Sequence, residues 1–168
     1  MNMKILGIDP GSSRLGYGLI EKRGSQLKFL KAGTLEVEES DPNQKLLYLA
    51  KDLKKIMANF RPSLVAIEKI YFSKNVKTAI EVAQARGLII FLVLDQQIPI
   101  VEISPQQAKS AVTSYGAADK GAVAKMVSLL LNRPNLKELD DATDALAIAI
   151  AGAGLYKGCI TSDTSWTL

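Results

Sequence analysis

The stretch Lys-Ile-Leu-Gly-Ile-Asp at residues 4–9 decides the fold, because a short apolar run ends there in a carboxylate. Residues 4–8 have the length and composition of a buried strand, and Pro10 and Gly11 predict a turn after it. An acidic side chain beside a buried element is costly unless it is paired, protonated or bound to a cation. This stretch therefore predicts a central strand with Asp9 as a candidate functional residue at its end.

The order of the remaining elements predicts a mixed sheet. Turn residues separate the first strand from two more, which makes an antiparallel start. Helical stretches with apolar positions at three- and four-residue spacing then alternate with short apolar runs. The predicted strands are 4–8, 15–21, 27–36, 64–68 and 98–101, and the predicted helices are 42–60, 77–95, 105–112, 122–131 and 140–153. This order predicts an α/β fold with a five-stranded mixed sheet flanked by helices.

The composition is that of a globular domain. The chain has 168 residues, of which 48% are hydrophobic and 23% charged, enough to bury a core. We predict one domain over residues 1–157 and a short, loose tail over 158–168, which is rich in Ser and Thr. No apolar stretch reaches the length needed to span a bilayer, and the single Cys159 excludes an intrachain disulfide. We therefore expect a soluble, cytoplasmic protein without a membrane partner.

The charge balance favours phosphate-rich partners. Lys and Arg number 21 against 17 Asp and Glu, which gives a net charge of +4. This excess is modest, but it gains weight if several acids are gathered in one cluster, because the rest of the surface is then more basic.

Glu68 is a second candidate acid. It closes the apolar run 64–67 in the same way that Asp9 closes the first strand. Two alternatives remain open: Asp9 can be an ordinary turn residue, and Glu68 can pair with Lys69 or Lys74.

Asp141 and Asp144 open a long apolar helix. Their three-residue spacing places both on one face, and Ala145 and Ile148 continue that face toward the core. The alternative is that both acids only complement the helix dipole. Asp140 can do that from outside, so two further acids that face the core favour a ligand-binding role.

The four acids together predict a site for a hard cation. The chain has no histidine, and a cluster made only of carboxylates suits Mg²⁺ or Mn²⁺. In a basic protein, such a cluster points to metal-dependent chemistry on phosphates.

Residues 69–78 are a candidate nucleic-acid contact. Tyr71 and Phe72 lie next to Lys74 and Lys77 in the sequence, and this mixture suits unstacked bases on rings and phosphates on cations. The alternative is a pair of core aromatics beside solvated lysines.

Six short motifs together resemble the RuvC family of bacterial Holliday-junction resolvases. They occur in the family's order and spacing across about residues 4–153, nearly the whole chain. They are Gly-Ile-Asp-Pro-Gly-Ser (7–12), Gly-Tyr-Gly (16–18), Ala-Ile-Glu (66–68), Gln-Ala-Arg-Gly (84–87), Ala-Asp-Lys (118–120) and Asp-Ala-Thr-Asp-Ala-Leu-Ala-Ile-Ala (141–149).

The resemblance implies a ribonuclease-H-like fold, a homodimer, and Mg²⁺-dependent cutting of four-way DNA junctions to 5′-phosphate and 3′-hydroxyl ends in recombination and repair. It also implies a branch-migration partner of the RuvA/RuvB type. The metal-binding acids of the family correspond to Asp9, Glu68, Asp141 and Asp144. The expected mechanism uses two Mg²⁺ ions bridged by Asp9, with Mn²⁺ as a substitute.

The resemblance assigns further residues to the DNA. Basic residues near the scissile phosphate correspond to Lys109 and Lys120, of which Lys120 offsets charge on the phosphorus; on sequence alone both can also be plain solvated charges. The junction-stacking aromatic corresponds to Tyr71 or Phe72. The pair Gly-Ala that follows Lys120 departs from the polar residues expected there, which bears on affinity rather than on the reaction.

Other functions are compatible with parts of the sequence. A non-catalytic junction-binding module would use the same surface, but it would not need all four acids. An ATPase of the actin and sugar-kinase superfamily also has a Gly-Ile-Asp-x-Gly loop, but it needs a second lobe. The related YqgF-type nucleases are usually shorter and lack the Gln-Ala-Arg-Gly helix. Residues 79–94 are more apolar than one amphipathic helix needs, so we expect them to form the dimer interface.

Overall fold

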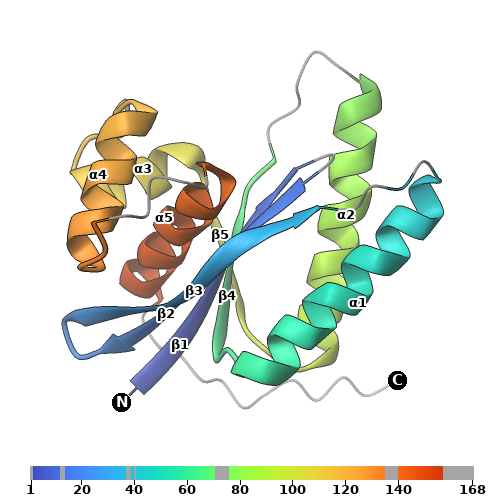
Figure 1. Cartoon of the computed structure of the whole chain (residues 1–168), viewed down its shortest axis with the longest axis horizontal. Helices are drawn as coiled ribbons and strands as arrows, with labels where there is room; N and C mark the ends of the chain where they lie inside the picture. The colour runs from blue at the N-terminus through green and yellow to red at the C-terminus, as the bar shows by residue number, and fades with distance from the viewer. Residues whose placement is uncertain are drawn as a thin grey trace.

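The computed structural model describes residues 2–11, 14–36, 39, 41–70, 76–134 and 140–156. Five strands form one sheet in the order β3-β2-β1-β4-β5 (Figure 1). The strands β1 (Asn2–Pro10), β2 (Arg14–Arg23) and β3 (Gln26–Glu36) pair antiparallel, and β4 (Leu64–Glu68) and β5 (Ile100–Ile103) continue parallel to β1. The predicted mixed sheet of five strands is confirmed.

Helices cover both faces of this sheet. One face carries α1 (Pro42–Phe60) and α2 (Val76–Asp95). The other carries α5 (Asp140–Leu155), with α3 (Pro105–Thr113) and α4 (Lys120–Leu130) beside it (Figure 1). The result is a three-layer α/β arrangement, in which β1 is the central strand.

Each face of the sheet has its own hydrophobic core, because successive strand residues point to opposite sides. On β1, Ile5 packs under α5, whereas Leu6 and Ile8 pack under α1 and α2. All three side chains are fully buried. The helix α5 is buried nearly all round, as its sequence predicts, with Ala145, Leu146, Ile148 and Ala149 among its buried residues.

The helix ends follow from local sequence signals. Asp41 caps α1, since its side chain accepts a hydrogen bond from the Asn43 amide at 2.9 Å, and Arg61 ends the helix in the left-handed conformation. At the start of α3, Ser104 and Gln107 form a capping box. These are the boundaries that the sequence predicts for both helices to within a residue.

Several predicted boundaries are displaced by two residues, among them those of β5 and α4. The last strand covers 100–103 rather than 98–101, because Ile98 completes the end of α2 by donating its amide to the Val93 carbonyl at 3.2 Å. Glu102 is part of the strand and pairs with Arg86 of α2. The helix α4 begins two residues earlier than predicted, at Lys120, after Asp119 as its N-cap.

No helix in the described part of the chain is both long and apolar enough to cross a membrane. The predicted tail, including Cys159, lies outside the described residues.

Candidate active site

Asp9 and Glu68 lie side by side at one edge of the sheet. The parallel strands β1 and β4 pair Ile8 with Ile67, so the residues that follow them reach the same edge. Ile8 and Ile67 point into the α1–α2 core. Because side chains alternate along a strand, Asp9 and Glu68 both face the opposite side, where α5 lies.

The helix α5 brings the other two acids to this edge. Its N-terminal turn rests on β2, where a Cβ atom built on Gly16 would lie 2.2 Å from the Asp141 carbonyl oxygen. Gly16 is in turn the antiparallel partner of Asp9. Asp141 therefore lies above the strand pair that carries Asp9, and Asp144 follows one helical turn later.

Glycines make this close approach of α5 possible. A Cβ on Gly7 would lie 2.0 Å from the Ala145 carbonyl oxygen, and one on Gly18 would lie 2.7 Å from the Leu146 amide nitrogen. In the sequence, the Gly-Tyr-Gly motif stands out only through the family resemblance, which gives it no structural role. A local signal for that role exists, because two glycines spaced by two share one face of a strand.

The site raises the pKa of Glu68 to about 8, well above its ordinary value of 4.5. Burial is the largest cause, followed by the negative charge of Asp9 and a hydrogen bond with the Asp9 carboxylate. A protonated Glu68 donates that hydrogen bond, and Asp144 adds further repulsion.

The pKa of Asp9 is also raised, to about 6 from 3.8. Burial again dominates, and the charges of Asp144 and Asp141 act in the same direction, whereas the hydrogen bond from Glu68 and the charge of Lys120 lower it. Asp9 and Glu68 thus share a proton near neutral pH. Asp9 lies within β1 rather than in the turn that follows it, and Glu68 is hydrogen-bonded to Asp9. The alternative partner Lys74 lies outside the described residues.

Lys120 is the basic residue that the structure brings to the acids. It opens α4, and its Nζ atom lies 3.7 Å from Oδ2 of Asp144. Lys109 lies half-buried on α3, the neighbouring helix, and it forms no ion pair with a carboxylate of the described residues. Of the two predicted lysines, Lys120 is therefore the one that pairs with the acid cluster.

The predicted DNA-binding residues are not placed by this structure. Tyr71, Phe72 and Lys74 lie outside the described residues, and Lys77 lies in α2 with its side chain outside them. Lys69, next to Glu68, donates its amide to the Ile103 carbonyl at 2.8 Å, and α2 begins at Val76.

The donor set of the site has the chemistry of a divalent-cation centre. Its four side chains offer carboxylate oxygens alone, and a cation would relieve the repulsion and burial that raise two of their pKa values. Within the described residues, however, no three Asp, Glu, His or Cys side chains are already arranged around a common point that could hold an ion.

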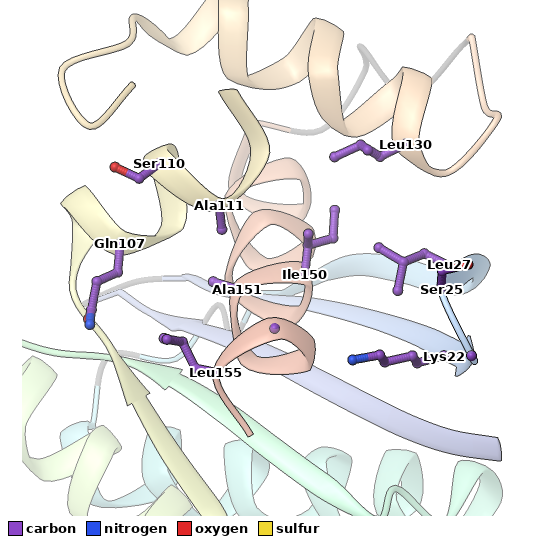
Figure 2. Close-up of a pocket in the computed structure, with 12 residues that line it drawn as sticks. Lys22, Ser25, Leu27, Gln107, Ser110, Ala111, Leu130, Ile150, Ala151 and Leu155 are labelled. Carbon is purple, nitrogen blue, oxygen red and sulfur yellow. The ribbon is translucent and has the colours of Figure 1, made fainter. Parts of the chain in front are cut away.

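A separate hollow of about 730 Å³ lies at the other end of α5 (Figure 2). The hairpin of β2 and β3 contributes Lys22 and Leu27, and the end of α5 contributes Ile150 and Leu155. Lys22 also donates to the Ala153 carbonyl at 2.6 Å, which provides a partner for one of the last carbonyl groups of the helix. Among the described residues that line the hollow none is acidic, so it is distinct from the acid cluster.

Comparison with known proteins identifies the family. Residues 5–152 match the sequence model of the family described as crossover junction endodeoxyribonuclease RuvC. The protein of that name from Caldicellulosiruptor saccharolyticus is 43% identical over 150 residues, which cover 88% of this chain and 90% of that protein. The one from Petrotoga mobilis is 43% identical over 148 residues, which cover 88% of this chain and 91% of that protein.

A solved structure agrees with this assignment. The structure of RuvC from T. thermophilus in complex with a Holliday junction substrate is similar with a TM-score of 0.84 at 28% identity. The similarity covers 90% of this chain and 93% of that chain, and it confirms the predicted ribonuclease-H-like fold. The chain belongs to the RuvC family of crossover junction endodeoxyribonucleases.

Proposed function

We propose that the protein is a structure-selective DNA endonuclease that resolves four-way junctions by paired symmetric nicks, in recombination and repair. One observation carries this proposal beyond family membership. The ends of β1 and β4 and the start of α5 bring Asp9, Glu68, Asp141 and Asp144 together, and the pKa values of Asp9 and Glu68 are raised by burial and mutual repulsion. Such a site is poised to exchange protons for cations.

The four acids are the proposed ligands of divalent cations. As a member of this family, the protein is a divalent-metal-dependent nuclease, and we propose two Mg²⁺ ions, for which Mn²⁺ can substitute. Bound cations supply activation of a water molecule and stabilisation of the leaving oxygen. Asp9 is the central ligand, because it lies between Glu68 on β4 and the α5 acids above β2. The products are 5′-phosphate and 3′-hydroxyl ends.

Lys120 is the proposed electrostatic partner of the reacting phosphate. Its Nζ atom lies beside Asp144, and its side chain is 70% exposed, so it can meet DNA that approaches the acids. A positive charge held there stabilises the negative charge that develops on the phosphate in the transition state. Lys109 has a supporting role in the same proposal, from the neighbouring helix α3.

The stretch from the end of β4 into the start of α2 is the proposed region of junction contact. Glu68 ends β4 at the acid cluster, so the residues after it start beside the reacting phosphate. Lys74 and Lys77 are proposed to contact the backbone, and Tyr71 or Phe72 to stack on bases at the opened crossover.

A homodimer is the proposed active form, and helix α2 supports it. Ile80, Phe91 and Leu94 are exposed on this helix, and a Cβ on Gly87 would meet open space. The positions 80, 84, 87, 91 and 94 follow the alternating four- and three-residue spacing of a helix–helix seam. A two-fold dimer presents two equal sites to a two-fold junction. A branch-migration complex of the RuvA/RuvB type is the proposed partner.

The catalytic domain in this proposal is residues 1–157, followed by the tail 158–168. The non-catalytic junction-binding alternative and the ATPase alternative are not favoured, because the family that the chain belongs to consists of endonucleases.

A cleavage assay tests the proposed function directly. Purified protein is incubated with Mg²⁺ and either a synthetic four-way junction or a linear duplex of the same sequence, and the products are mapped on a denaturing gel. We expect paired nicks at symmetric positions of the junction and none in the duplex. Binding of the junction without cutting in Mg²⁺ or Mn²⁺ would contradict the proposal.

A further inference from the structure

Gly16 occupies a crowded point between the sheet and α5. A Cβ atom at this position would lie 2.2 Å from the Asp141 carbonyl oxygen, 2.7 Å from its carbonyl carbon and 3.2 Å from its Cβ. Nonbonded carbon atoms pack at about 3.5–4.0 Å. Two of these three atoms belong to the helix backbone and cannot turn away, so any side chain here would displace the first turn of α5.

The same residue is tied to a second acid of the site. Gly16 pairs with Asp9 across the β1–β2 ladder, so it lies beside one acid and directly below another. A change in the distance between β2 and the start of α5 therefore also changes the distance between Asp9 and Asp141.

We propose that Gly16 is a positioning residue for junction cleavage: its missing side chain sets the height of Asp141 above Asp9. This inference rests on the proposed role of these acids. A side chain at position 16 would lift the N-terminal turn of α5 by about 1 Å, since the shortest approach falls short of normal packing by more than that. Misplacement of a reacting group by ~1 Å can cost ~10²-fold in rate.

The far end of the same helix provides a matched control. Gly152 lies against β4, where its Cβ would be 2.6 Å from the Ala66 Cβ atom. It follows Asp141 by eleven residues, or about 16 Å along the helix at ~1.5 Å per residue. A side chain at 152 strains the packing between the same helix and the same sheet, but it does so away from the acids.

The experiment compares Gly16→Ala with Gly152→Ala in the full-length protein. Three quantities are measured: the melting temperature without metal, its rise on addition of Mn²⁺ without DNA, and the single-turnover rate on a four-way junction. We expect both variants to melt earlier than the wild type. Only Gly16→Ala should lose the rise in melting temperature on addition of Mn²⁺ and cut the junction ~10²-fold more slowly. Its junction affinity in a gel shift should stay within about twofold of the wild type, because no basic residue changes.

Two further variants keep the inference testable if Gly16→Ala does not fold. Gly18→Ala pushes on Leu146, which lies five residues after Asp141 and two after Asp144, and it should give a smaller loss than Gly16→Ala but a larger one than Gly152→Ala. Adding Asp141→Glu to Gly16→Ala, or to Gly18→Ala, should restore part of the metal-induced rise, because the longer side chain reaches back toward Asp9.

Equal losses in metal response for the position 16, 18 and 152 variants would overturn the inference, as would a wild-type cutting rate in Gly16→Ala. Failure of the proposed function looks different. In that case the wild type itself does not cut the junction, and the metal-induced rise still reports whether Gly16 sets the separation of the acids.

Discussion

The Nζ atom of Lys120 lies 3.7 Å from Oδ2 of Asp144, although Lys120 begins α4 and Asp144 belongs to α5. This ion pair joins α4 to the acid cluster and places a solvent-exposed positive charge beside it. The charge of Lys120 also lowers the pKa of Asp9, whereas burial and the charges of the other acids raise it. Lys120 is therefore coupled to two acids of the site.

Replacement of Lys120 with alanine should slow junction cutting by ~10²–10³-fold, which is the usual effect of removing one group that stabilises transition-state charge. Junction binding should change little, since the side chain contributes one charge among many. Single-turnover cleavage and gel shifts measure the two effects. Lys125→Ala, on the same helix and also exposed, is the control and should cut normally. Equal cutting rates for the two variants would show that Lys120 takes no part in the reaction.

Each of the substitutions Asp9→Asn, Glu68→Gln, Asp141→Asn and Asp144→Asn should abolish cutting while junction binding survives. An amide preserves the size of the side chain but removes a negative charge that a divalent cation needs. Asp52→Asn on α1 is the control, since Asp52 pairs with Lys55 on the surface away from the acids. Wild-type cutting by two or more of the four variants would show that the metal-site assignment is wrong.

The metal-free protein should lose stability as the pH rises from about 4.5 to about 8. The folded protein holds a proton on Glu68 up to a pKa of about 8, whereas the ordinary value is 4.5. The folded state thus binds more protons than the unfolded state in this range, so the free energy of unfolding falls with increasing pH. Below a pH of about 4.5 this stabilising contribution is fully present.

Urea denaturation at about pH 5 and about pH 8 measures this loss. Glu68→Gln cannot ionise at this position, so the variant should lose less stability between the two pH values than the wild type does. Added Mg²⁺ should reduce the loss in the wild type at the higher pH, because it binds the ionised carboxylates. An identical pH dependence in wild type and variant, without metal, would contradict the raised pKa.

Substitutions after Glu68 should distinguish residues that contact the DNA backbone from the aromatic residue that stacks on bases. Alanine at Lys74 or Lys77 should lower the magnitude of the salt slope of log K by ~0.9 for each phosphate that the protein no longer neutralises. Alanine at Tyr71 or Phe72, whichever one stacks, should remove ~1–3 kcal/mol of base stacking. The reduction in cutting should be larger on a closed junction than on one with unpaired bases at its centre. Equal reductions on both substrates would mean that the rings are core residues.

The exposed face of α2 should hold the dimer together. Phe91→Glu places a charge on a side chain that is 64% exposed on this helix, and it should produce monomers in light scattering at micromolar concentration. Leu129→Glu is the control, because Leu129 is 63% exposed but lies on α4. A wild type that is monomeric both with and without a junction would exclude the dimer.

Much of the fold follows from short-range sequence patterns. The caps at Asp41 and Ser104 and the apolar period of 42–60 predict the helices, because hydrogen bonding and amphipathicity at a helix end are local. The boundary of β5 differs from its prediction for a non-local reason. Ile98 bonds back to α2 and Glu102 pairs with Arg86 from that helix, and neither interaction is visible in the run of apolar residues.

The identity of the candidate acids follows from neighbouring residues alone. Asp9 and Glu68 close apolar runs, and Asp141 and Asp144 share one face of a helix that is buried nearly all round, so all four could be singled out from the chain around them. How close the acids come depends instead on long-range packing, namely the strand pairing between β1 and β4 and the approach of Gly16 to Asp141, which join residues far apart in the chain. The raised pKa values and the position of Lys120 follow from the same packing, since electrostatic energy depends on separation in space and on burial.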